Sequence, residues 1–233
     1  MAVNVNTVYQ TVLLILNQQQ RGYITPDEFN KIATQAQLTM FEAYASDLNQ
    51  QYRLPDNDTE YADRVKNIQQ KLQFFQRVGS TAYVGPEFKL NTAGGDVLYR
   101  LGSIFYKDIE LGQYSQRNEI TQLLLSPLTQ PTEKFPIYLY ENDKLYVYPT
   151  TIQSNVTFSY LAKPRDVVWG FTTGAQGQYL YAAGTSVQFD LDVTEQDELI
   201  MRILAYAGVI IQDPTIIQTA SQAVANQDNN EKQ

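Results

Sequence analysis

Carboxylates are the main candidates for acid–base chemistry in this sequence, which contains neither histidine nor cysteine. The chain therefore lacks the commonest general base, the commonest transition-metal ligand and any thiolate nucleophile. Two carboxylates can hydrolyse a glycosidic bond when they are held at a suitable separation. The candidates in the central part of the chain are Glu110, Glu119, Glu133 and Glu141. Each lies beside a turn or a strand end, where a solvated carboxylate is ordinary, so we expect no catalytic residue and no enzyme.

Two glycine-containing loops and two acidic runs are the candidate ligand-binding motifs. The loops, AGGD at residues 93–96 and the segment 170–177, lack the glycine-plus-lysine pattern of a phosphate-binding loop. The runs DND at 56–58 and DLD at 190–192 could offer oxygen ligands to calcium. The rest of a calcium loop is missing from both, and short acidic runs beside helix starts are ordinary caps. We therefore expect turns and caps, with no metal and no cofactor.

Tyrosine is abundant, with 17 residues in the chain. Several fall at alternate positions of predicted strands and so share faces: Tyr138, Tyr140, Tyr146, Tyr148, Tyr160, Tyr179 and Tyr181. Such faces can pack within a sheet, contact a neighbouring subunit or stack on sugars. All three interpretations stay open, and Tyr146, Tyr148 and Tyr160 are the candidate subunit-interface residues.

Three amphipathic helices are predicted in the first third of the chain. The first covers residues 7–20. The second begins at Thr25, where TPDE supplies an N-cap, a proline in the first turn and a capping-box Glu28. A third follows the break at 54–58. Short connections favour an antiparallel bundle.

The pattern changes to strands from about residue 79 to residue 192. Strands are predicted at 98–106, 135–140, 144–148, 155–161 and 186–191, with a hairpin turn at 141–143 and a brief helix at 119–125. Helix returns at residue 194, where Thr194 begins a capping motif and Gly208 is a candidate for close helix contact. Asp213 and Pro214 then interrupt the chain.

The last segment carries an apolar stripe too small to form its own core. It either folds back on the bundle or lies in a partner's groove, and we expect the partner. The candidate partner-binding residues are Ile216, Ile217, Ala220, Val224, Asn230 and Lys232. The predicted fold is α+β: a helical bundle from both chain ends with an inserted Tyr-rich antiparallel β region. Its parts are N-terminal helices (1–78), a β-rich region (79–192), a C-terminal bundle helix (193–211) and a docking tail (212–233).

Charge and hydropathy exclude further classes of protein. The net charge of −8 argues against binding nucleic acid through phosphate neutralisation. No segment approaches the roughly 20 consecutive apolar residues of a membrane span, so we expect no membrane partner.

Nearly the whole chain resembles a known family, both in its overall arrangement and in local stretches of sequence. The three stretches are VNVNTVYQTVLLILNQQQRGYITPDEFNKIATQAQLTMFEAY (3–44), SPLTQPTEKFPIYLYENDKLYVYPTTIQSNVTFSYLAKPRDVVW (126–169) and ELIMRILAYAGVIIQDPTIIQTASQAVANQDNNEKQ (198–233). They resemble virion structural proteins of crAss-like and related short-tailed bacteriophages.

The resemblance implies a head–tail connector adaptor in the virion, assembled in the bacterial host cytoplasm. Such a protein forms a ring, usually twelve-fold, below the portal protein and beside other neck and tail ring proteins. The genome passes through its lumen without specific binding. A ring subunit needs complementary side surfaces and no chemistry, and an acidic lumen would let DNA slide. The alternative is a tail or neck protein that binds a glycan or receptor through its tyrosine-rich β region.

Overall fold

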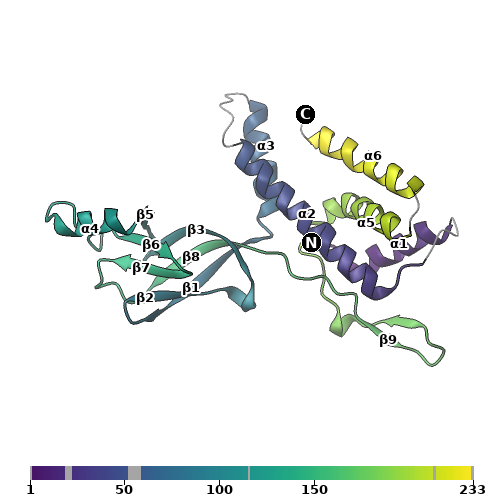
Figure 1. Cartoon of the computed structure of the whole chain (residues 1–233), viewed down its shortest axis with the longest axis horizontal. Helices are drawn as coiled ribbons and strands as arrows, with labels where there is room; N and C mark the ends of the chain where they lie inside the picture. The colour runs from purple at the N-terminus through teal and green to yellow at the C-terminus, as the bar shows by residue number, and fades with distance from the viewer. Residues whose placement is uncertain (1, 19–22, 52–58, 115, 212–213, 232–233) are drawn as a thin grey trace. The chain divides into compact units, whose positions relative to one another are not determined.

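The computed structural model describes residues 2–18, 23–51, 59–114, 116–211 and 214–231 (Figure 1). The chain forms two compact units. Unit 1 combines Met1–Phe74 with Pro164–Gln233, and unit 2 is the continuous segment Phe75–Lys163. The predicted β-rich region 79–192 therefore covers most of unit 2 and runs on into the returning half of unit 1.

Unit 2 is built on a sheet with the strand order β4-β3-β8-β1-β2-β7-β6-β5. All of its strand pairs are antiparallel except β5 with β6, which is parallel. The strands are β1 (Gln76–Val84), β2 (Glu87–Asn91), β3 (Leu98–Tyr106), β4 (Ile109–Glu110), β5 (Gly112–Tyr114), β6 (Ile137–Glu141), β7 (Lys144–Tyr148) and β8 (Val156–Ala162).

Leu111 joins the two edges of this sheet. It is the single residue between β4 and β5, which stand at opposite ends of the strand order. The Leu111 N–H donates to the Ile104 carbonyl at 2.9 Å, and the next N–H, of Gly112, donates to the Pro136 carbonyl at 3.1 Å. Because the chain crosses from one edge to the other within one residue, the sheet must curl until it is nearly closed. Closure also removes exposed strand edges.

The inner face of this curled sheet holds the core of unit 2. Leu145 and Val147 point inward from β7, while the alternate residues Lys144, Tyr146 and Tyr148 are only half-buried. This alternation follows from the two-residue period of a strand. The core also includes Phe88, Ile104, Leu111, Tyr138, Phe158 and Tyr160. The short helix α4 (Arg117–Leu125) lies between β5 and β6 in the sequence, close to the predicted range.

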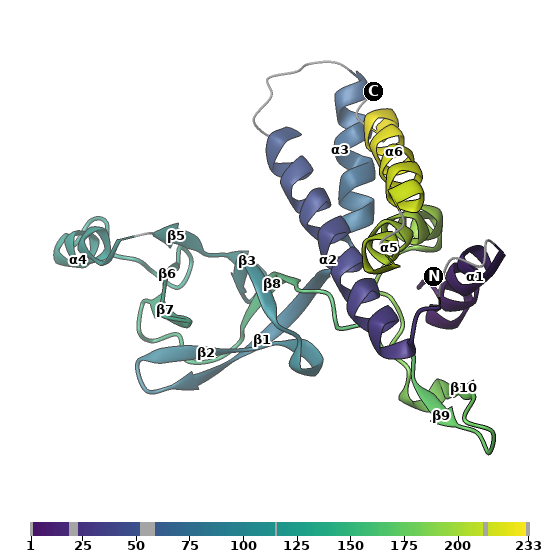
Figure 2. The ribbon, with the colours of Figure 1, turned by 45° about the vertical axis from the view of Figure 1, so that its right-hand side comes forward.

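Unit 1 contains the other helices of the described chain: α1 (Val5–Gln18), α2 (Pro26–Gln51), α3 (Thr59–Leu72), α5 (Gln196–Ile211) and α6 (Pro214–Glu231). Helix α5 packs against α1, α2 and α6, and α3 packs against α2 (Figure 2). The buried side chains of α5, among them Leu199, Ile203 and Ala207, recur at helical spacing as its apolar stripe requires.

The predicted start of α2 is confirmed. The Thr25 N–H and hydroxyl both donate to Glu28 Oε2, at 2.9 and 2.7 Å, and the Glu28 N–H donates back to Thr25 Oγ1 at 3.4 Å. This reciprocal pattern is a capping box, which satisfies N–H groups that have no partner inside the helix.

Helix α2 also fixes the segment that returns from unit 2 to unit 1. Its Asn30, Thr34 and Gln37 lie at helical spacing and bond to the backbone of residues 165–169. The bonds run from Trp169 N to Asn30 Oδ1 (2.7 Å), from Val167 N to Thr34 Oγ1 (3.0 Å) and from Gln37 Nε2 to the Arg165 carbonyl (2.9 Å). Beyond this segment the chain forms a hairpin of β9 (Phe171–Thr173) and β10 (Tyr179–Tyr181).

The predicted fold class, an α+β helical bundle with an inserted Tyr-rich antiparallel β region, is wrong. The chain is a mixed α/β structure in which a large, nearly closed eight-stranded sheet forms a unit of its own, alongside six helices among the described residues. The error came from the sequence at 76–91, where β1 and β2 were not recognised. β1 and β2 pair with each other as a hairpin and also with the distant strands β8 and β7, so their place in the sheet depends on residues far along the chain.

The predicted strand at 186–191 is also not a strand. Phe189 and Leu191 are buried as the alternation required. The Asp190 N–H, however, donates to the Gln37 side chain of α2, and the Leu191 carbonyl accepts from the Val3 N–H. This stretch contributes only an isolated bridge between Val187 and Val168. Alternating burial thus identified an extended buried segment whose hydrogen-bond partners are not strands.

Candidate functional site

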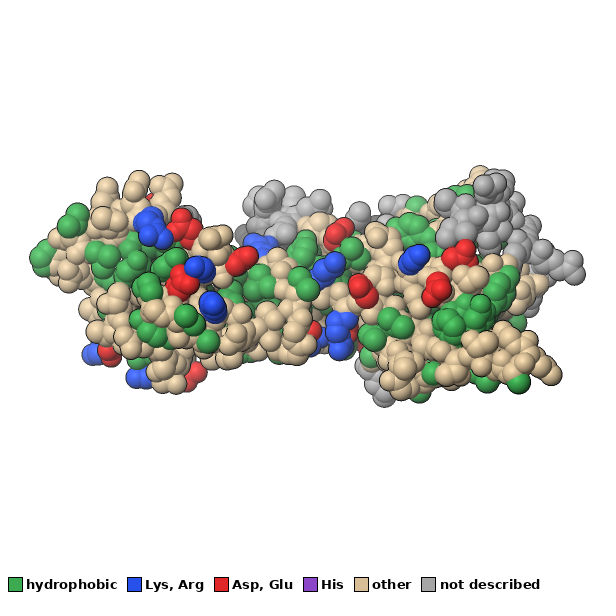
Figure 3. All heavy atoms as spheres, turned by 60° about the horizontal axis from the view of Figure 1, so that its bottom comes forward, with side chains coloured by type: hydrophobic (Ala, Val, Ile, Leu, Met, Phe, Trp, Pro, Cys, Tyr) green, Lys and Arg blue, Asp and Glu red, His purple; other side chains and the backbone are tan. Residues whose placement is uncertain are grey.

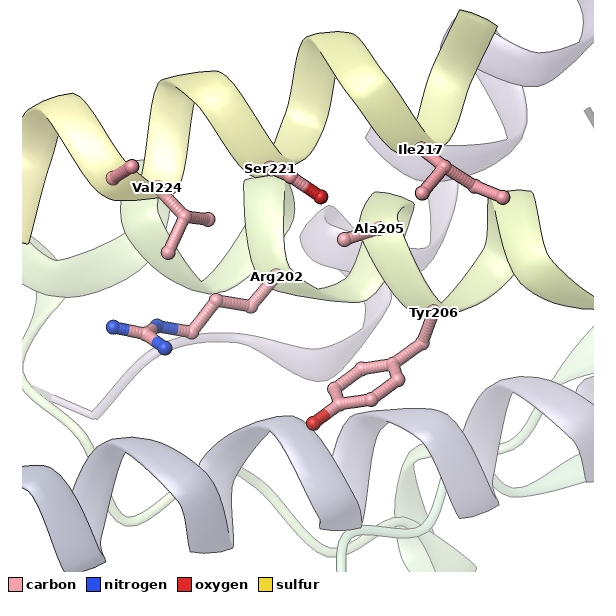
Figure 4. Close-up of a pocket in the computed structure, with 7 residues that line it drawn as sticks. Arg202, Ala205, Tyr206, Ile217, Ser221 and Val224 are labelled. Carbon is pink, nitrogen blue, oxygen red and sulfur yellow. The ribbon is translucent and has the colours of Figure 1, made fainter. Parts of the chain in front are cut away.

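A groove of about 390 Å³ lies over the contact between α5 and α6 in unit 1 (Figure 4). Most of its lining is apolar or small. The lining side chains are Arg202, Ala205 and Tyr206 from α5 and Ile217, Ser221, Val224 and Ala225 from α6. The groove therefore joins part of the predicted partner-binding stripe with residues that the sequence prediction did not include.

Gly208 sets the close approach of the two helices. A Cβ at this position would lie 3.0 Å from both Ile216 Cγ2 and Ile217 Cγ1, and 3.1 Å from the Ile217 nitrogen. Only glycine fits without a shift of the helix opposite, so the predicted helix contact at Gly208 is confirmed.

Charged and polar groups border the groove. Arg202 pairs with Glu198, one turn earlier on α5, and its Nε donates to Glu198 Oε1 at 2.6 Å. Tyr206 points from α5 toward α2, whose Thr39 Oγ1 lies 3.3 Å from the Tyr206 hydroxyl (Figure 4). These contacts hold the α5 side of the groove in a defined shape.

The predicted partner-binding residues have different environments. Ile216, Ile217 and Val224 are half-buried, and Ala220 is buried at 4% exposure. Asn230 belongs to the backbone of α6, but its side chain is outside the described residues, as is all of Lys232. Part of the stripe therefore packs against the other helices of unit 1, whereas Ile217 and Val224 line the groove.

Unit 2 exposes an apolar segment that sequence reasoning missed. Leu125 is 77% exposed, Leu128 95% and Phe135 78%, all on α4 or in the loop that follows it. The space-filling view shows hydrophobic side chains over this end of unit 2, at the left of Figure 3. The run LLLSPL at 123–128 was the available signal, since runs of exposed apolar residues are unusual outside interfaces. We call Leu125, Leu128 and Phe135 the α4 patch.

Hydrogen bonds within the loop that follows α4 stabilise the segment that carries Leu128 and Phe135. Gln130 Nε2 donates to the Leu124 carbonyl at 2.8 Å, and the Thr129 N–H donates to the Ser126 carbonyl at 3.2 Å. The Phe135 N–H donates to the Thr132 carbonyl at 3.0 Å. The exposed side chains therefore project from an ordered loop, which lowers the entropy cost of binding.

The three candidate interface tyrosines differ in environment. Tyr160 is only 2% exposed, and its hydroxyl accepts a 2.9 Å hydrogen bond from the Ala93 N–H. This burial favours the packing interpretation for Tyr160. Tyr146 and Tyr148 lie half-buried on the outer face of β7.

Tyr146 lies within a group of charges. The Arg117 guanidinium is 5.1 Å from its ring centroid, and its hydroxyl donates to Glu87 Oε2 at 3.3 Å. Lys144, 2.8 Å from Glu87, holds the pKa of the Glu87 carboxyl below its ordinary value of 4.5. The outer face of β7 is therefore a polar surface of paired charges, unlike the α4 patch.

The candidate carboxylates mostly engage local partners. Glu110 accepts from the Ser103 hydroxyl at 2.7 Å, Glu133 from the Thr151 hydroxyl at 3.3 Å, and Glu141 pairs with Arg117 at 2.7 Å. Glu119 is exposed in the first turn of α4. These partners are those of surface carboxylates.

Of the two acidic runs, DLD at 190–192 lies within the described residues. Arg165 bonds both carboxylate oxygens of Asp190, and Asp192 accepts from the Val193 N–H at the start of a 3₁₀ turn. The cap at Asp192 is the role that the sequence predicted, whereas the pairing of Asp190 with Arg165 was not predicted. The DND run at 56–58 lies outside the described residues. The described part of the chain holds no group of three or more Asp or Glu side chains that could bind a metal ion.

Comparison of the sequence with protein-family models and with curated proteins gives no match. Among the helices of the described residues, none combines the length and apolar character that crossing a membrane requires.

Proposed function

We propose that this chain is a non-enzymatic assembly subunit of a bacteriophage virion. In this proposal it is a head–tail connector adaptor that forms an oligomeric ring below the portal protein and extends the DNA exit channel. The family resemblance described above suggests the place in the virion. The α4 patch is the structural observation that favours an assembly role.

The α4 patch supports assembly because three large apolar side chains are exposed on one ordered segment. Leu125, Leu128 and Phe135 are each more than three-quarters exposed. Scattered exposed apolar residues are normal, but several within one short segment favour a surface that a partner covers. Burial of such side chains in an interface is favourable because it removes apolar surface from water.

The α5–α6 groove supplies a second surface, of opposite shape. It is concave, and Ile217 and Val224 are only half-buried within it. A ring subunit that also docks on another ring needs a docking surface in addition to the surfaces that contact its neighbours in the ring. We assign the groove to docking on the portal protein or a neck protein, and the α4 patch to contacts between subunits.

Native mass measurement of the purified protein, with and without the portal ring of the same virion, tests the proposal. We expect the protein alone to be a monomer or a mixture of small oligomers, and the portal ring to template a closed ring. Leu128→Ser combined with Phe135→Ser should abolish that ring. Val97→Ser is the matched control, since Val97 is 63% exposed in unit 2 outside the α4 segment.

The serine variants must keep the fold for this comparison to be informative. Both replaced side chains are almost fully solvated, so the free energy of unfolding should change by less than about 0.5 kcal/mol. A chain that remains monomeric beside portal and neck proteins would contradict the proposal. Full ring formation by the double variant would show that the α4 patch does not form the contacts between subunits.

A further inference from the structure

A second pocket, independent of the groove, lies in unit 1 between α1 and the β9–β10 hairpin. Its volume is about 480 Å³, within the range of about 300–1,000 Å³ typical of small-molecule sites. The lining combines aromatic rings with side-chain amides: Asn6, Tyr9, Gln10, Leu13, Tyr23, Trp169, Gly177, Gln178, Tyr179, Leu180 and Tyr181. Hydrophobic side chains, tyrosine included, gather on this face at the right of Figure 3.

The floor of the pocket is buried and aromatic. Trp169 and Tyr9 are each 4% exposed, with ring centroids 4.3 Å apart. Trp169 also contacts Tyr181 at 5.8 Å and stacks on Phe171 at 6.0 Å. Burial, and after it the neighbouring Tyr23 and Tyr179, raise the pKa of the Tyr9 phenol above its ordinary value of 10.0. The Tyr9 phenol therefore stays neutral in the physiological pH range.

Hydrogen bonds fix the floor in place. The indole Nε1 of Trp169 donates to Asn6 Oδ1 at 3.1 Å, and the backbone N–H of Trp169 donates to Asn30 Oδ1 at 2.7 Å. Gln188 Nε2 donates to the Tyr181 hydroxyl at 3.4 Å. Because these three hydrogen bonds hold the floor in place, its shape exists before a ligand binds, and this reduces the entropy lost on binding.

The rim is open, and its described residues carry no charge. Tyr23 is 54% exposed, Tyr179 42% and Leu180 50%. Gln10 and Gln178 bring amide donors and acceptors to the same edge. The lining residues carry no charged side chain, so their composition favours a neutral ligand with both apolar and hydrogen-bonding surface.

From this combination we infer that the pocket binds a neutral saccharide. A sugar ring presents a face of C–H groups that packs on an aromatic ring, while its hydroxyls bond to amides and phenols around the edge. A proline-rich peptide fits less well, because its proline residues have no N–H and would leave many of those polar groups unsatisfied. A nucleic acid strand would need cationic side chains that the lining lacks.

This inference does not depend on the proposed assembly role. The pocket shares no residue with the α4 patch or with the α5–α6 groove. Loss of one function therefore leaves the other unchanged, and the two can be tested separately.

The only tryptophan of the chain is Trp169, so intrinsic tryptophan fluorescence reports this pocket alone. The full chain is titrated with maltotriose, cellotriose and triacetylchitotriose, alongside trigalacturonic acid and decaproline. We expect a saturable fluorescence change with at least one neutral trisaccharide and none with the acidic sugar or the peptide. Saturation-transfer NMR with the same compounds detects any binding that leaves the fluorescence unchanged.

Tyr179→Ala should weaken the binding about five- to tenfold, the loss expected from one aromatic contact. Gln10→Ala, on the exposed face of α1, should also weaken it. Tyr99→Ala is the control, because Tyr99 is 47% exposed in unit 2, and its affinity should match the unmodified chain. Failure of every neutral trisaccharide in both measurements overturns the inference. So does binding of decaproline or trigalacturonic acid at equal or higher affinity, or equal weakening by Tyr99→Ala.

Discussion

The fully buried Gln37 side chain accepts a 2.8 Å hydrogen bond from the backbone N–H of Asp190, a residue 153 positions later in the chain. Through its other amide atom it donates to the Arg165 carbonyl at 2.9 Å. One glutamine of α2 thus satisfies the backbone of two separate segments in the interior of unit 1. An apolar replacement would remove this partner from a partly buried N–H and from a partly buried carbonyl.

Gln37→Leu is therefore expected to lower the free energy of unfolding by about 1–3 kcal/mol, since an unsatisfied buried group costs about 1–3 kcal/mol and these two groups are only partly buried. Urea denaturation measures the change. Gln35→Leu, on the exposed side of the same helix, should change the value by less than about 0.5 kcal/mol. Equal effects of the two variants would show that the Gln37 hydrogen bonds do not stabilise the fold.

The hydrogen bond of the Tyr44 hydroxyl is the second buried polar contact that we expect to stabilise unit 1. Its hydroxyl donates to Glu195 Oε2 at 2.7 Å, and Lys71 Nζ lies 3.4 Å from the same oxygen. Tyr44→Phe should cost about 1.5–3 kcal/mol, the usual value of a hydrogen bond to a charged group. Tyr206→Phe removes a hydroxyl from a more exposed position and should cost much less. Thermal and urea unfolding of both variants would decide this, and an equal loss would count against the Glu195 contact.

The capping box at Glu28 predicts a pH dependence of stability. Hydrogen bonds from Thr25 hold the pKa of the Glu28 carboxyl below its ordinary value of 4.5 in the folded chain. Because the folded pKa is the lower one, this stabilisation is fully present above pH 4.5 and is lost as the pH falls through the lowered value. The difference in unfolding free energy between the unmodified chain and Glu28→Ala should accordingly shrink over that acid range. Gln35→Ala, an exposed change of a residue that does not titrate on the same helix, should show no such trend, and a pH-independent difference for Glu28→Ala would refute the prediction.

The α5–α6 groove predicts a separation between folding and docking. Val224→Glu places a charge in a half-buried, mainly apolar groove, and we expect it to weaken docking on the portal ring at least about tenfold. The melting temperature should fall only slightly. Gln218→Glu, exposed on the same helix, is the control of equal charge. Affinity measured by surface plasmon resonance would rule out the groove if both variants bound equally well.

Deletion of residues 212–233 is a less specific test than Val224→Glu. Ala220 is 4% exposed, and both Ile216 and Ile217 reach the α5 backbone at Gly208. Removal of α6 would expose that surface and lower stability together with docking. A single substitution in the groove keeps the two effects apart.

Local features of the sequence were predicted well because they depend on neighbouring residues. The capping box at Thr25 and Glu28 follows from four adjacent side chains. The turn at Asn142 and Asp143 requires two residues with positive φ (53° and 56°), which asparagine and aspartate tolerate. The bounds of β3 and β7 agree with the predicted ranges, and the residues of β7 alternate along the strand. In each case the determinant lies within one element.

The tertiary structure alone decided which segments pair and which surfaces remain exposed. Closure of the sheet at Leu111 depends on strands from both ends of unit 2. Trp169 joins Tyr9 and Tyr181 in one pocket because Asn6 and Asn30, from two different helices, hold its nitrogens. Tyr160 is buried at 2% exposure, whereas the apolar Leu128 is 95% exposed. Hydrophobicity along the chain specifies that a side chain is apolar, whereas its burial depends on distant residues that fold over it.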